Sequence, residues 1–163
     1  MARVYIGVGS NVDHDHNIRE GVKVLKQQFG ELVISPVYES TSVGFDSDNF
    51  LNLVIGFDTG LELTTLAKAL REIEYKFGRS RKEPRFSPRT LDIDILLYDD
   101  VITHEGYLQV PRDDIDKYAF VLRPLADIAA DMKHPLTGQR YSDLWNAFDQ
   151  TGQELWHIDI DLD

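Results

Sequence analysis

The chain has 163 residues, a formal net charge of −11 and no cysteine. Its length suffices for a buried core, and the lack of cysteine excludes a disulfide framework, a thiolate zinc site and a cysteine nucleophile. An acidic chain also lacks the basic face that extended contact with nucleic acid or an anionic membrane requires. We therefore expect one domain over residues 1–163 with neither of these partners, and the sequence leaves the oligomeric state open.

The compartment can be predicted from the same features. The start of the chain shows no secretory signal pattern, and no apolar run reaches the length of a membrane-spanning helix. Together with the absence of cysteine, this fits a reducing cytoplasm, which is the localisation we expect.

Two motifs near the N-terminus each allow more than one interpretation. Gly7 and Gly9 belong to a strand expected over residues 4–9, where a lone Gly-x-Gly indicates a weak nucleotide fingerprint or a tight strand-to-helix turn. Residues 13–16, Asp-His-Asp-His, have the spacing of metal ligands, but we interpret them as polar capping. They precede a helix expected over residues 18–29, whose apolar positions follow the helical period.

The next segments predict two strands joined by a loop. Residues 31–43 read as a strand with Pro36 as an edge or bulge mark, and residues 44–49 as a loop. Residues 50–57 alternate as a second strand, in which Asn52 is a polar side chain among apolar ones. Asn52 is either a satisfied core amide or a hydrogen-bonding group for a planar heterocycle.

A second helix is expected over residues 61–77, with Gly78 at its end. Glu74 lies on the last turn, where a carboxylate is unfavourable for the helix dipole. We therefore expect Glu74 to have a local partner such as Arg79 or Arg81, or to contact a ribose hydroxyl.

A basic loop and an acidic strand form the most informative stretch. Five of the 17 Lys and Arg residues lie between Arg79 and Arg89. In the strand that follows, the odd-numbered apolar residues of 91–97 are expected to face one way, and Asp92 and Asp94 the other, with Cα atoms roughly 6.5 Å apart. Two such carboxylates form an ion-pair network with arginine or bind a cation, and oxygen ligands favour Mg²⁺. Because the basic loop suits a polyphosphate, we favour the metal.

The C-terminal part predicts shorter elements. We expect a turn and a returning strand over residues 99–110, short helical turns over 119–129 and a short helix over 142–148. The tail at 156–163 alternates and carries a second Asp-x-Asp, which we interpret as an edge strand with an acidic solvent face. The whole order predicts an α+β, ferredoxin-like β-α-β-β-α-β fold: an antiparallel sheet with helices on one face and a C-terminal extension.

Six motifs together carry a family resemblance. They are Gly9-Ser10-Asn11, Tyr38-x-Ser40, Phe50-Leu51-Asn52, Glu74-x-x-x-Gly78-Arg79-x-Arg81, Pro88-Arg89-Thr90-Leu91-Asp92-Ile93-Asp94-Ile95-Leu96 and Phe120-Val121-Leu122-x-Pro124-Leu125. In order and spacing they resemble the 6-hydroxymethyl-7,8-dihydropterin pyrophosphokinase family. The resemblance covers residues 4–138, and the run over 88–96 is its most specific part.

The resemblance implies transfer of pyrophosphate from MgATP to the pterin hydroxymethyl group, giving AMP, in folate biosynthesis. It implies that Asp92 and Asp94 hold two Mg²⁺ ions and that Arg79 and Arg89 contact the migrating phosphates. The ATP contacts that it implies are Glu74, Arg81, Ile95 and Arg112. The pterin contacts that it implies are Ser40, Val43, Phe50, Asn52, Phe86 and Phe120.

Three positions depart from the family pattern. Phe86 stands where Trp is usual, Arg112 where His is usual, and Tyr118 where Arg is usual. These departures leave open a divergent paralogue that binds pterin or nucleotide with weak or altered transfer. Two other classes explain less: an RNA-binding sheet needs a basic surface, and a ligand-sensing regulatory domain gives no reason for Asp92 and Asp94.

Overall fold

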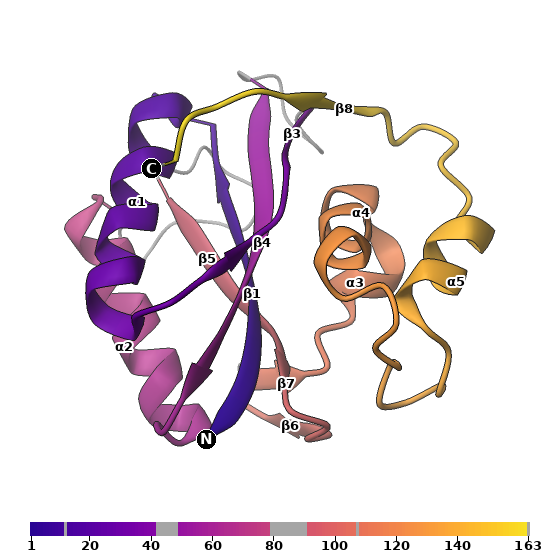
Figure 1. Cartoon of the computed structure of the whole chain (residues 1–163), viewed down its shortest axis with the longest axis horizontal. Coiled ribbons are helices and arrows are strands. Elements are labelled where there is room, and N and C mark those ends of the chain that lie inside the picture. The colour runs from indigo at the N-terminus through magenta and orange to yellow at the C-terminus, as the bar shows by residue number, and fades with distance from the viewer. Residues whose placement is uncertain (12, 42–48, 79–90, 107, 163) are drawn as a thin grey trace.

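The fold is built on one six-stranded antiparallel sheet, shown in the computed structural model of Figure 1. The structure describes residues 1–11, 13–41, 49–78, 91–106 and 108–162. The strand order is β5-β1-β4-β3-β8, and β2 also pairs with β4. The strands are β1 (Ala2–Ser10), β2 (Val33–Ile34), β3 (Val37–Ser40), β4 (Phe50–Thr59), β5 (Asp92–Tyr98) and β8 (Leu155–Ile158).

Helices cover both faces of this sheet (Figure 1), and a small hairpin forms a separate two-stranded sheet that packs against β5. None of the helices that the structure describes is both long and apolar enough to cross a bilayer. The helices are α1 (His14–Phe29), α2 (Leu63–Lys76), α3 (Asp114–Lys117), α4 (Ala119–Ile128) and α5 (Tyr141–Ala147), and the hairpin strands are β6 (Thr103–Glu105) and β7 (Leu108–Val110).

The first helical layer, α1 and α2, packs on alternate residues of the central strands. Ile6 of β1 and Ile55 of β4 are fully buried in one cluster with Ile18 of α1 and Leu66 of α2. This alternation is what made the strands recognisable in the sequence. The predicted β-α-β-β-α-β order, the antiparallel pairing and the face covered by α1 and α2 are confirmed.

The C-terminal extension forms a second layer on the opposite face. Helix α4 packs on β4 and β3, with α3 and α5 beside it. Leu122 and Leu125 of α4 are buried in a cluster with Tyr5 and Val54 of the sheet. The sequence predicted only short helical turns here. Helix α4 instead continues through Pro124, which lacks the N–H for one backbone hydrogen bond.

A β-bulge in β5 changes which side chains share a face. Tyr5 of β1 pairs with Leu97, and Ile6 pairs with Ile95, so Leu96 is the extra residue. Leu97 is therefore buried in the α4 layer, whereas Ile95 is buried in the layer of α1 and α2. The prediction that placed both on one face is wrong for Leu97.

The glycine motif lies inside β1 and opens no helix. Gly7 and Gly9 are both paired with β4 on one side and with β5 on the other. The motif is therefore not a tight strand-to-helix turn, and that interpretation is wrong. It also lacks the glycine-rich loop at the start of a helix that a nucleotide fingerprint requires. Its position in the middle of the sheet matters for the site described below.

Other boundaries differ from the predictions in smaller ways. Helix α1 already begins at His14, and Asp13 takes the N-cap position without a side-chain capping bond. The strand expected over 31–43 is divided at Pro36 into β2 and β3. The expected returning strand is the hairpin β6–β7. In the tail, β8 pairs with the outer side of β3, as an edge strand should, while residues 159–162 lie beyond it.

Leu125→Ala tests whether the two layers unfold as one domain. Leu125 is fully buried, so the variant should lower the free energy of unfolding by about 2–5 kcal/mol. Leu136→Ala, at a position 62% exposed, should change it by less than about 0.5 kcal/mol.

Trp145 lies in α5 of the second layer, and Trp156 lies in β8 at the edge of the sheet. In a Trp156→Phe background, tryptophan fluorescence therefore follows the second layer, while circular dichroism follows the whole fold. We expect urea transitions that coincide and shift together in Leu125→Ala. Separate transitions for the two probes would contradict a single domain.

Candidate active site

The two carboxylates of β5 lie next to the glycines of β1. Asp94 pairs with Gly7, and Asp92 pairs with Gly9. On its other side Gly9 pairs with Asn52 of β4. A Cβ atom on Gly9 would lie 2.6 Å from Oδ1 of Asn52. The Asn52 amide therefore occupies space that is free only because residue 9 is a glycine.

A cavity beside α4 brings predicted metal-binding and pterin-binding residues together. Asp92 and Asp94 line it from β5, Asn52 lines it from β4, and Phe120 lines it from α4. Asp114, the first residue of α3, also lines this cavity and was not predicted. The local sequence gave no signal for it, because only long-range packing brings α3 to the sheet.

Phe120 is supported by a neighbouring aromatic ring. The rings of Tyr118 and Phe120 are stacked, with centroids 5.0 Å apart and an interplanar angle of 22°. Tyr118 is one of the positions that depart from the family pattern. The departure removes a positive charge and supplies a ring that stacks on Phe120 at the cavity wall.

Two further predicted pterin-binding residues lie along the same strand pair. Ser40 pairs with Phe50, two positions from the pair of Tyr38 and Asn52, so they share a face of the sheet with Asn52. Neither Ser40 nor Phe50 lines the cavity itself. Five further residues predicted to belong to the site lie outside the described part of the chain: Val43, Arg79, Arg81, Phe86 and Arg89.

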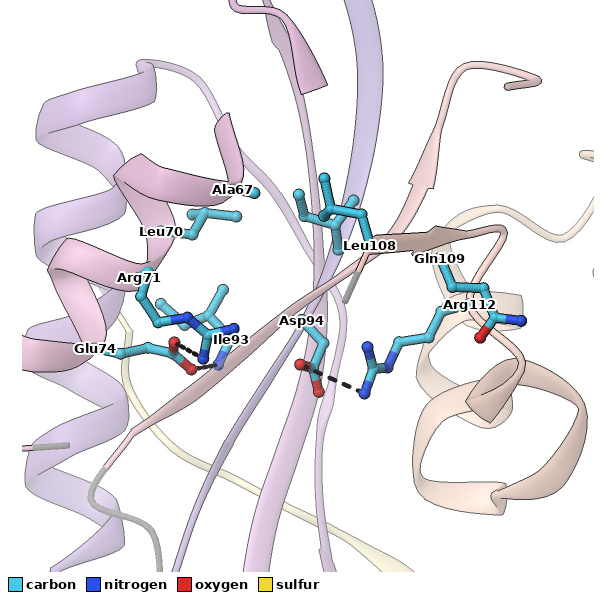
Figure 2. A pocket seen from close by; sticks show the side chains of 10 residues that line it. Ala67, Leu70, Arg71, Glu74, Ile93, Asp94, Leu108, Gln109 and Arg112 are labelled. Atoms are coloured by element: carbon cyan, nitrogen blue, oxygen red, sulfur yellow. Dashed lines mark hydrogen bonds and ion pairs between the residues drawn. The ribbon is translucent and has the colours of Figure 1, made fainter. Parts of the chain in front are cut away.

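A second pocket gathers the described residues predicted to bind ATP (Figure 2). Glu74 lines it from α2, Ile95 from β5, and Arg112 from the segment between β7 and α3. Asp94 lines this pocket as well as the cavity of Phe120. The cavity beside α4 and the second pocket therefore share Asp94.

Glu74 anchors α2 to β5. Its side chain is 1% exposed, and its carboxylate accepts hydrogen bonds from the backbone N–H of Ile93 at 2.8 Å and from Arg71 Nη1 at 2.9 Å. Arg71 was not among the predicted partners, although its i,i+3 spacing to Glu74 was a usable signal. The expected partners Arg79 and Arg81 lie outside the described residues.

Arg112 lies between two carboxylates. Its Nε donates to Asp114 Oδ2 at 3.0 Å, and its Nη2 lies 3.7 Å from Asp94 Oδ1. The backbone N–H of Arg112 donates to the carbonyl of Leu96 at 2.9 Å, which fixes the segment to β5. Burial lowers the pKa of Arg112, but the charges of Asp94 and Asp114 outweigh it and raise that pKa above its usual value.

Asp92 and Asp94 suit an ion that brings ligands of its own. In the described ranges, no three His, Cys, Asp or Glu side chains converge as a set of metal ligands. The Asp-His-Asp-His motif at 13–16 therefore forms no such set either. Mg²⁺ keeps several waters, and proteins commonly hold it with one or two carboxylates plus substrate phosphates. Two half-buried carboxylates that line one cavity fit that requirement.

Gly9→Ala tests the close approach between β1 and Asn52. The new methyl group should displace the Asn52 amide and lower the free energy of unfolding by about 1–3 kcal/mol. Gly7→Ala is the matched control, because a Cβ there meets Leu96 at an ordinary 3.6 Å. The side-chain amide signals of Asn52 in ¹⁵N NMR spectra should shift strongly in Gly9→Ala alone. Equal shifts in both variants would contradict the close approach of Asn52 to Gly9.

Comparison with known proteins places the chain in a family. The model of 7,8-dihydro-6-hydroxymethylpterin-pyrophosphokinase (HPPK) matches residues 5–130. A 2-amino-4-hydroxy-6-hydroxymethyldihydropteridine pyrophosphokinase of Aquifex aeolicus is 37% identical over 138 residues, 83% of this chain and 86% of that protein. The enzyme of the same name from Pseudomonas aeruginosa is 39% identical over 142 residues, 83% of this chain and 85% of its own length.

Solved structures show the same fold at low sequence identity. A wild-type HPPK-DHPS from Plasmodium falciparum superposes with a TM-score of 0.67 at 12% identity, over 89% of this chain and 44% of that one. An HPPK-DHPS in complex with substrates gives a TM-score of 0.70 at 14% identity, over 90% and 43%. This chain thus spans less than half of these longer proteins. By its family match and its relatives, the chain belongs to the 7,8-dihydro-6-hydroxymethylpterin-pyrophosphokinase family.

Proposed function

We propose that this protein transfers pyrophosphate from ATP to the hydroxymethyl group of 6-hydroxymethyl-7,8-dihydropterin and releases AMP, as a step of folate biosynthesis. The observation that carries the proposal is the meeting of Asp92, Asp94, Asn52 and Phe120 in one cavity that adjoins a second pocket at Asp94. The cavity beside α4 offers an aromatic ring and an amide, and the second pocket offers cationic side chains and an apolar wall. A planar heterocycle and a nucleotide would then meet at the carboxylates.

The pterin half uses stacking and hydrogen bonding. Phe120, held by Tyr118, presents a ring face to a planar heterocycle. Asn52 carries both a donor and an acceptor, as the hydrogen-bonding edge of a pterin requires. We assign the remaining pterin contacts to Ser40 and Phe50, which pair across β3 and β4, and to Val43 and Phe86.

The nucleotide half uses the second pocket. Ile95 gives the base an apolar wall, and Glu74 lines the same pocket. The Glu74 carboxylate already accepts from Arg71 and from the Ile93 N–H, and its remaining lone pairs can accept from a ribose hydroxyl. Arg112, together with Arg79, Arg81 and Arg89 of the basic loop, is assigned to the phosphates. Guanidinium groups bind phosphate oxygens through paired N–H donors, and they remain charged throughout.

We assign two Mg²⁺ ions to Asp92 and Asp94. When bound, they would neutralise phosphate charge and polarise the β-phosphate towards the attacking hydroxyl. The chain itself supplies no nucleophile, because the pterin oxygen forms the new bond to the β-phosphorus and AMP leaves. The task of the protein residues is to bind both substrates in line, to exclude water and to hold charge near the transferred group.

The product test separates pyrophosphate transfer from other uses of the fold. Purified protein given MgATP and 6-hydroxymethyl-7,8-dihydropterin should form AMP and the pterin diphosphate in equal amounts, with no ADP, by chromatography. Product ADP, or bound pterin without AMP at any Mg²⁺ concentration, would instead favour a divergent paralogue with lost or altered transfer.

Asp94→Asn tests the metal assignment with a closely matched control. The neutral amide keeps the shape of the side chain but removes the charge that holds the ion, so kcat should fall by about 10³-fold or more. The control is Asp159→Asn in the second Asp-x-Asp of the chain, because Asp159 is exposed and lines neither the cavity nor the second pocket. That variant should keep its full rate. A similar loss in both variants, or normal activity in Asp94→Asn, would refute the assignment.

A further inference from the structure

Arg112 already occupies one of the carboxylates assigned to the metal. Its Nη2 lies 3.7 Å from Asp94 Oδ1, while its Nε donates to Asp114 Oδ2 at 3.0 Å. All three side chains are partly shielded: Arg112 is 26% exposed, Asp94 is 31% exposed and Asp114 is 12% exposed. The guanidinium thus bridges two acids from different elements, and Figure 2 shows its contact with Asp94 in the second pocket.

The two contacts of Arg112 differ in strength. The contact with Asp114 is a hydrogen bond of ordinary length, whereas the 3.7 Å contact with Asp94 is a looser ion pair. Arg112 can therefore leave Asp94 while Asp114 still holds its Nε. Asp94, Asp114 and Asp92 all act on the charge of Arg112, so this guanidinium stays positive in any ordinary buffer.

A divalent cation and a guanidinium compete for the same carboxylate. An ion bound at Asp94 carries two positive charges into the place where Nη2 now lies, and like charges at such distances repel in a partly buried site. A metal ion that binds without a nucleotide must therefore break the Arg112–Asp94 ion pair. It offers the displaced guanidinium no new anionic partner in return. A nucleotide changes this, because its phosphates offer the guanidinium a new partner.

We propose that Arg112 is a resident counter-ion of Asp94, and that a divalent cation displaces this guanidinium from Asp94 and a phosphate then accepts it. Arg112 in this way makes metal and nucleotide bind together rather than separately. As a binding residue, it weakens binding of the free ion and strengthens binding of the ion–nucleotide complex. Both halves of the proposal rest on the metal assignment of the proposed function, and the second half rests on its nucleotide assignment as well.

The coupling follows from linkage. If Arg112 opposes the free ion and favours the phosphate, nucleotide must raise the affinity for metal, and metal must raise the affinity for nucleotide by the same factor. Removing the guanidinium should reduce this factor. A residue that only stabilised the fold would leave the factor unchanged.

The experiment measures Mn²⁺ binding by electron paramagnetic resonance in the full chain, first without nucleotide and then with a non-hydrolysable ATP analogue. In Arg112→Gln, we expect the free ion to bind about five- to tenfold more tightly than in the unmodified protein. The ATP analogue should bind more weakly to this variant, and its coupling to Mn²⁺ should fall. Arg112→Lys keeps the charge but not the forked geometry, and should lie between the two.

Lys117→Gln is the matched control for charge alone. Lys117 donates to Asp113 at 2.8 Å on the surface, and it also feels the charge of Asp114, so its removal makes the same change in net charge nearby. We expect Mn²⁺ binding close to that of the unmodified protein. An equal gain in Lys117→Gln would show a general electrostatic effect and overturn the proposal.

A measurement on the unmodified protein covers the case in which Arg112→Gln does not fold. The ¹⁵N signal of Arg112 Nε, assigned with Arg112→Lys, should shift when Mg²⁺ alone is added. An unmoved signal at saturating Mg²⁺, or unchanged free-ion affinity in a folded Arg112→Gln, would overturn the proposal. Neither measurement needs pterin or turnover, so a failure of the AMP assay with intact Mn²⁺ results would count against the proposed function alone.

Discussion

The pairing of β1 with β4 on one side and β5 on the other is the constraint on which the site depends. This register sets Gly9 between Asn52 and Asp92, and Gly7 between Val54 and Asp94. Because the two glycines carry no side chain, the polar groups on the neighbouring strands can approach across β1. Any other residue at position 9 would bring its Cβ to 2.6 Å from Asn52 Oδ1, which is too close for the two atoms to coexist unshifted.

The C-terminal extension completes what the sheet begins. The sheet contributes the carboxylates and the amide, whereas Phe120, Arg112 and Asp114 come from the segment that follows β7. The layer that holds α4 against Tyr5 and Val54 therefore also positions the groups that line the two pockets. Two of the departures from the family pattern lie in this layer and gain structural roles there. Tyr118 stacks on Phe120, and Arg112 bridges Asp94 and Asp114.

Much of this arrangement could be predicted, because local patterns determine it. Alternation along β4 and β5 gave the faces of Asn52, Asp92 and Asp94, and the helical period gave α2 with Glu74 on its last turn. What failed depends on pairing between distant segments. Leu97 changed face because of a bulge that arises only where β5 meets β1, and no local pattern marks such a bulge.

The unpredicted contacts at the site have the same origin. The Gly-x-Gly motif is locally compatible with a turn, and only its two strand partners reveal its role inside β1. Asp114 and the bridge made by Arg112 depend on how the chain returns from β7 to the sheet, through the bond from the Arg112 N–H to Leu96. Arg71 was the exception, since its spacing to Glu74 was visible in the sequence and was overlooked.

The central claim is that Asp92 and Asp94 bind the ions at a junction between a pterin site and a nucleotide site. A crystal structure with Mn²⁺, a non-hydrolysable ATP analogue and 6-hydroxymethylpterin tests it most directly, because Mn²⁺ accepts the same oxygen ligands as Mg²⁺ and scatters anomalously. We predict anomalous density within about 2.2 Å of oxygens of both aspartates, with the pterin ring against Phe120. Ions bound elsewhere, with Asp94 still paired to Arg112, would contradict it.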